Sequence, residues 1–133
     1  MRLCYRLLLV FLAACGTSTS SYNSSPPPPP GAPPPPPAPG TVAVSVADYS
    51  YAPDSILVAV GTPVRWTNEG TNVHRVTSDN GGFGSPDLAG TGIDSYGNPT
   101  PGGTYSRTFS TAGTFPYHCG VHPFMTGKVV VSP

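Results

Sequence analysis

The chain has 133 residues, enough for one small domain with appendages, and it carries only six basic and six acidic residues. So few charges exclude the dense basic face that nucleic-acid binding requires. Of three cysteines, Cys4 and Cys15 fall in the N-terminal segment, so Cys119 is the one thiol of the domain that follows. An internal disulfide in that domain is therefore excluded.

Residues 1–14 are predicted to be a lipoprotein signal peptide. Two arginines precede an apolar run at 7–14, which is far shorter than the ~20 residues that a membrane-spanning helix needs. Small residues lead directly to Cys15, as in the lipid-modified site of bacterial lipoproteins. The alternative is an ordinary cleaved signal in which Cys15 is incidental. The expected location is the bacterial cell envelope, on the periplasmic face, and Gly16 in place of an aspartate favours the outer membrane.

Residues 15–40 are predicted to be a disordered linker. Its first half is rich in Ser and Thr, and eleven prolines lie between Pro26 and Pro39. Such a proline run forms an extended polyproline helix that rises ~3.1 Å per residue and acts as a semi-rigid spacer. The segment fits a stalk that lifts the domain off the membrane.

Residues 41–133 contain short runs in which apolar and polar residues alternate. Alternation with period two predicts strands that are buried on one face. The runs lie at 42–47, 56–60, 64–67, 73–77, 105–110, 114–119 and 128–131. Seven or so short strands with turn signals and no helical stretch indicate an all-β sandwich domain.

Residues with metal-binding chemistry gather near the C-terminus. Cys119, His122 and Met125 are spaced Cys-x2-His-x2-Met, and His74 stands alone upstream. Soft sulfur ligands favour copper, and two imidazoles with a thiolate and a weak axial Met describe a blue-copper site. We therefore predict that these four residues hold one copper ion. The alternatives for Cys119 are an inert buried thiol and a catalytic nucleophile.

Strand alternation also sorts the neighbours of Cys119. Phe115, Tyr117 and Cys119 share one parity, so Cys119 is expected to point inward. His118 has the opposite parity and is expected to be structural or at the surface.

The segment at 79–103 holds eight Gly and three Pro without periodicity. A loop of this length in a compact domain is often functional or mobile, and it could contain a short helix or hairpin. Its acidic residues, Asp79, Asp87 and Asp94, lack EF-hand spacing, which disfavours calcium.

The domain resembles the cupredoxins, and within them the amicyanin and plastocyanin group. The residues that carry the resemblance are Tyr117-His118-Cys119, His122-Pro123-Phe124-Met125, Gly127-Lys128-Val129-Val130-Val131, and Val64-x-Trp66-x-Asn68 followed by His74. The resemblance implies an eight-stranded Greek-key β-sandwich, a type 1 copper site and single-electron transfer.

Two positions depart from the family pattern. Val73 stands where the family usually has Pro before the first His ligand. Arg75 stands where a small polar residue often follows that ligand and can hydrogen-bond towards the Cys loop. The segment at 79–103 has no clear counterpart in amicyanin, which disfavours an amine dehydrogenase as partner.

The function expected from these observations is a single-electron carrier and not an enzyme. Three in-plane ligands and an axial Met leave no open position for a substrate, unlike catalytic zinc sites. A copper-holding or copper-delivery protein is the main alternative, although such proteins tend to carry Met- or His-rich tracts. A cysteine hydrolase using Cys119 would lack an orienting acid nearby, and a metal-free adhesive sandwich is a further alternative. We expect a monomer that meets its redox donor and acceptor transiently.

Overall fold

The computed structural model describes residues 40–133, so the predicted signal peptide, Cys15 and nearly all of the linker lie outside the described residues. Within this range the chain forms strands, and no helix there could span a membrane. The strands are β1 (Val42–Ala47), β2 (Ser50–Ala52), β3 (Ser55–Ala59), β4 (Pro63–Asn68), β5 (Val76–Ser78), β6 (Gly92–Ile93), β7 (Pro99–Thr100), β8 (Thr104–Thr108), β9 (Gly113–Cys119) and β10 (Thr126–Ser132).

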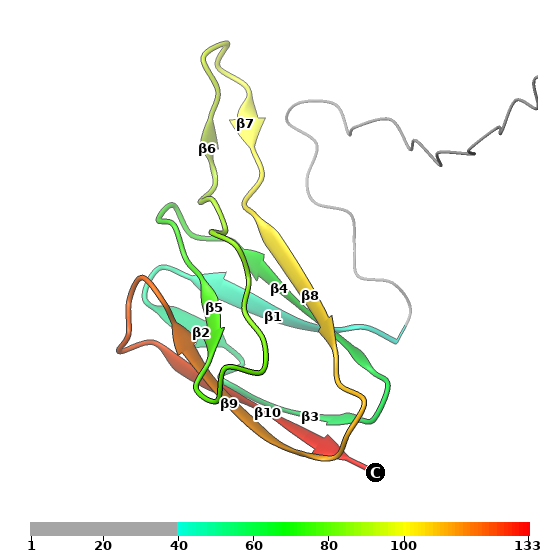
Figure 1. Ribbon diagram of the computed structural model, residues 1–133. Helices are drawn as coiled ribbons and strands as arrows, with labels where there is room; N and C mark the ends of the chain where they lie inside the picture. The colour runs from blue at the N-terminus through cyan, green and yellow to red at the C-terminus, as the bar shows by residue number, and fades with distance from the viewer. Residues whose placement is uncertain (1–39) are drawn as a thin grey trace, which may run out of the picture.

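Eight of these strands form two four-stranded sheets that pack face to face (Figure 1). One sheet has the order β2-β1-β4-β8 and the other has the order β3-β10-β9-β5. β1 is parallel to β4 and β3 is parallel to β10, whereas the other neighbouring pairs in these sheets are antiparallel. The arrangement confirms the predicted all-β Greek-key sandwich.

The core lies between the two sheets and follows the alternation in the sequence. Val64 and Trp66 on β4 are fully buried, and so is Val46 on β1. Burying a side chain of this kind stabilises the fold by about 1.5–3 kcal/mol relative to leaving it in water. The Trp66 ring packs edge-on against Tyr117 of the opposite sheet, with centroids 5.5 Å apart. This contact joins the sheets two residues before Cys119.

The Gly-rich segment at 79–103 contains the β6–β7 hairpin, which extends beyond the two sheets (Figure 1). At its tip the Asp94 carboxylate accepts hydrogen bonds from the backbone N–H groups of Tyr96 and Asn98. Gly97 has a φ of 86°, a conformation that glycine adopts without steric cost. β6 and β7 have two residues each, which is too few to show an alternating pattern. The positions of these strands could therefore not be predicted from the sequence, although the sequence allows for a hairpin in this loop.

The strand expected at 73–77 is shorter in the structure. β5 begins at Val76, and His74 forms an isolated bridge with Leu88 instead. The His74 N–H donates to the Leu88 carbonyl at 3.1 Å, and the Leu88 N–H donates back to the His74 carbonyl at 2.7 Å. The prediction that His74 lies within a strand is therefore wrong. A pair of backbone hydrogen bonds to Leu88 in the long loop holds this residue in place.

Candidate metal centre

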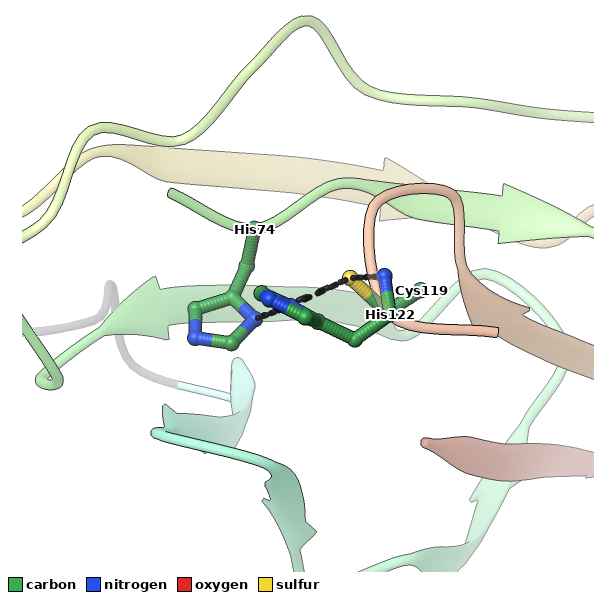
Figure 2. A group of neighbouring side chains, drawn as sticks. All are labelled: His74, Cys119 and His122. Carbon is green, nitrogen blue, oxygen red and sulfur yellow. Dashed lines mark hydrogen bonds between the residues drawn. The ribbon is translucent and has the colours of Figure 1, made fainter. Parts of the chain in front are cut away.

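Three of the predicted ligands meet at one end of the sandwich. Cys119 ends β9, His122 lies in the loop before β10, and His74 lies two residues before β5. Figure 2 shows the three side chains converging from these separate segments. Cys119 Sγ lies 3.6 Å from His74 Nδ1 and 3.9 Å from His122 Nδ1, and the two Nδ1 atoms are 3.3 Å apart.

The size of this triangle suits a metal ion. The point equidistant from the three atoms lies about 2.1 Å from each, within the ~2.0–2.3 Å of common metal–imidazole and metal–thiolate bonds. Cys119 and His74 are fully buried, and His122 is partly exposed. One buried thiol and two imidazole nitrogens at such distances form a sulfur–nitrogen donor set that fits copper.

The loop that contains Cys119, His122 and Met125 is closed by its own backbone. The Cys119 N–H donates to the Met125 carbonyl, and the Met125 N–H donates to the His122 carbonyl, both at 2.9 Å. The His122 N–H points at Cys119 Sγ at 3.4 Å. Met125 is 2% exposed, so its thioether is buried in the end of the sandwich that holds the other three residues.

The backbone of Arg75 connects the segment that contains His74 to the loop that contains Cys119. Its N–H donates to Cys119 Sγ at 3.4 Å, and its carbonyl accepts from the Gly120 N–H at 3.0 Å. Its side chain forms an ion pair with Asp87, with 2.6 Å between nitrogen and oxygen. A side chain at position 120 would meet the Thr77 hydroxyl and then the Arg75 side chain, so Gly120 leaves room for both. The link to the Cys loop therefore needs no small polar residue at position 75.

His118 lies outside the donor cluster, as strand parity predicts. Tyr117 and Cys119 are buried, whereas His118 is half-buried on the opposite face of β9. Its Nδ1 lies 2.6 Å from Asp79 Oδ1, in a surface ion pair.

The three acidic residues of the long loop have separate partners. Asp79 pairs with His118, Asp87 pairs with Arg75, and Asp94 accepts backbone hydrogen bonds at the hairpin tip.

Two residues that sequence reasoning missed reach the site from the two-residue turn between β1 and β2. Asp48 Oδ1 lies 3.5 Å from His74 Nε2. The Tyr49 ring stands edge-on to the His122 ring, with centroids 5.2 Å apart. Tyr49 has a φ of 71°, which is unusual for a bulky residue. The sequence offers no signal for either contact beyond this polar–aromatic pair between two apolar runs.

A family model described as copper-binding proteins of the plastocyanin/azurin family matches residues 39–132. The chain belongs to this family. The cupredoxin is 38% identical over 94 residues to amicyanin from Paracoccus denitrificans, which covers 71% of this chain and 67% of that protein. It is 34% identical over 92 residues to amicyanin-alpha from Methylorubrum extorquens, which covers 69% of this chain and 72% of that protein.

Solved structures show the same relationship. The cupredoxin is 38% identical to a reduced amicyanin mutant, with a TM-score of 0.54 over 71% of this chain and 85% of the other. It is 28% identical to a purple cupredoxin from Nitrosopumilus maritimus, with a TM-score of 0.57 over 68% of this chain and 99% of the other. These findings confirm the predicted family, the fold and copper as the cofactor.

Proposed function

We propose that this cupredoxin is a single-electron carrier with one type 1 copper ion held by His74, Cys119, His122 and Met125. The observation that carries the proposal is the compact triangle of His74 Nδ1, Cys119 Sγ and His122 Nδ1 at the buried end of the sandwich. When bound, copper supplies a one-electron couple between Cu(I) and Cu(II). Met125, which is buried in the same loop as Cys119 and His122, would supply a fourth and weaker donor through its thioether.

The residues of this chain hold the donor atoms in one arrangement. His74 is fixed by its two backbone hydrogen bonds to Leu88, and the sulfur of Cys119 faces the N–H groups of Arg75 and His122. Ligands that are constrained in this way move little when the charge of the site changes. Small rearrangement favours rapid electron exchange, and the buried positions of His74 and Cys119 exclude water.

An apolar patch surrounds the partly exposed His122 ring. It consists of Tyr49, Val121 and Phe124, which are exposed, together with His122 itself; we call it the His122 patch. No Asp, Glu, Lys or Arg occurs between Phe109 and Gly127. A redox partner would meet apolar surface here, and small transient contacts are typical of such encounters. With little charge to steer association, binding should depend weakly on salt.

The visible spectrum of the oxidised, copper-loaded protein tests the proposal. We expect an intense blue or green band from the copper–thiolate pair and a reversible one-electron wave in voltammetry. A colourless protein with weak copper bands would contradict the carrier function. A copper-holding or copper-delivery role would require rapid loss of Cu(I) to a competing acceptor. The sample should therefore be reduced with ascorbate and then challenged with a Cu(I) chelator, and rapid loss of copper would favour the delivery role.

Met125→Leu is expected to keep both copper and colour while raising the reduction potential. Losing a sulfur donor disfavours Cu(II) more than Cu(I). A tenfold change in the relative affinity for the two states corresponds to about 59 mV for one electron, and we expect a rise of at least this order. Voltammetry measures it. Loss of copper, or a lower potential, would assign Met125 a different role.

We also propose that the chain is a bacterial lipoprotein whose Cys15 carries lipid and whose residues 15–40 form a stalk in the cell envelope. The support is the apolar run at 7–14 that leads to Cys15. One acyl chain binds membranes only marginally, so a stable anchor needs several chains. Cys15→Ala should move the protein from the membrane to the soluble fraction after cell fractionation. A variant that stays as membrane-bound as the parent would refute the anchor.

A further inference from the structure

The β1–β2 turn brings a carboxylate to the nitrogen of His74 that faces away from the donor cluster. Asp48 Oδ1 lies 3.5 Å from His74 Nε2, while His74 Nδ1 faces Cys119 and His122. A neutral imidazole carries its proton on one nitrogen, and the other offers a lone pair. For Nδ1 to act as a metal ligand the proton must sit on Nε2, and Asp48 is the acceptor placed there.

Asp48 is itself fixed by the loop that leads to His74. Its Oδ1 accepts from the Asn72 N–H at 3.0 Å, and its Oδ2 accepts from the Thr71 N–H at 3.2 Å and the Thr71 hydroxyl at 3.0 Å. These hydrogen bonds tie the position of the carboxylate to the segment that carries the ligand.

Capping of this loop would by itself account for the hydrogen bonds from Thr71 and Asn72, but it does not account for the position of Oδ1 beside the imidazole. The His74 ring is fully buried, so water cannot reach Nε2. Within residues 40–133, Asp48 is the one polar group in contact with this nitrogen. A buried donor without a partner is costly, and the 3.5 Å separation, although long for a hydrogen bond, provides that partner.

We propose that Asp48 is a positioning residue of the metal centre, which fixes the Nε2–H tautomer of His74 and lowers the reduction potential of bound copper. An acceptor on the second nitrogen orients a ligand imidazole and raises its basicity. A nearby negative charge also favours Cu(II) over Cu(I). The effect on the potential rests on the proposed copper site, whereas the effect on the tautomer exists in the metal-free protein.

Three variants separate this role from capping. Asp48→Asn keeps the shape and removes the charge, and Asp48→Ala removes the acceptor. Thr71→Val is the matched control, since it deletes a hydrogen bond to Asp48 without touching His74. The first readout is the imidazole ¹⁵N shifts of the metal-free protein at a pH where His74 is neutral. We expect the Nε2–H tautomer in the parent and in Thr71→Val, and a mixture of tautomers in Asp48→Ala.

The second readout is the potential of the copper-loaded proteins. Asp48→Asn is expected to raise it by about 59 mV, a tenfold shift in relative affinity, while Thr71→Val leaves it unchanged. An Nδ1–H tautomer in the parent, or equal potentials in Asp48→Asn and Thr71→Val, would overturn the inference. If the parent does not bind copper, the proposed function fails and the tautomer readout still decides. If Asp48→Ala does not fold, the tautomer of the parent and the potential of Asp48→Asn decide.

Discussion

Cys119→Ser is expected to abolish the intense visible band of the copper-loaded protein. Cys119 is the one thiol in residues 40–133, and its sulfur forms one corner of the donor triangle. A serine hydroxyl is a hard donor and gives no low-energy charge transfer to Cu(II). The effect should be near-complete, because the only other sulfur in residues 40–133 is the thioether of Met125, which is a weaker donor.

The sandwich should survive this substitution. Serine is close to cysteine in size, and the core depends on residues such as Trp66 and Val129 on facing sheets. The cost is that of a buried hydroxyl, roughly 1–3 kcal/mol if it lacks a partner. His118→Asn is the matched control, because His118 adjoins Cys119 but faces Asp79. Absorption and far-ultraviolet circular dichroism should therefore separate the variants: persistent intense colour in Cys119→Ser would refute the ligand assignment.

Features with strong local chemistry could be predicted from the sequence. The types and spacing of Cys119, His122 and Met125 predict a copper-binding loop. The alternation of apolar and polar residues on β4 and β9 predicts both the strands and the side of the sheet that each side chain faces. His118 illustrates the value of that parity, since it adjoins a candidate ligand and still lies on the other face. β4 and β9 have six and seven residues, so the prediction of each strand rests on several alternating positions.

Features that depend on contacts between distant segments could not be predicted. Asp48 and Tyr49 approach the two histidines because the β1–β2 turn lies at the same end of the sandwich as the ligand loop. β2 has three residues, too few for a pattern. The Arg75 connection is made by backbone groups, whose hydrogen bonds leave no trace in the residue type.

The surface around His122 also depends on contacts between segments that are distant in the sequence. Phe124 is 70% exposed, so it does not pack beneath the ligand loop. Its ring lies 6.0 Å from that of Tyr49 and 6.1 Å from that of His122, centroid to centroid. The outward position of three neighbouring rings makes the His122 patch the place where a second molecule could come nearest to the buried donors.

Phe124→Glu is accordingly expected to slow electron self-exchange sharply while leaving the copper site intact. In the proposed encounter two molecules bring their His122 patches together. The substitution then places like charges face to face on a segment that has no other charged side chain between Phe109 and Gly127. Steering by charge changes association rates by roughly 10- to 1,000-fold at low ionic strength, so a loss of at least tenfold is expected. Added salt should restore part of the rate, because screening sets in over about 10 Å at 0.1 M.

Two control variants locate the contact. Leu57 on β3 is 71% exposed, almost as much as Phe124, but lies outside the His122 patch, so Leu57→Glu should leave self-exchange nearly unchanged. The second control is Tyr96→Glu. Tyr96 is exposed at the tip of the β6–β7 hairpin, which extends beyond the two sheets (Figure 1), so this variant tests whether the hairpin makes the contact. NMR line broadening in mixtures of oxidised and reduced protein measures the rates, and voltammetry checks each potential. If Tyr96→Glu slows exchange and Phe124→Glu does not, electrons leave near the hairpin and the assignment of the His122 patch is wrong.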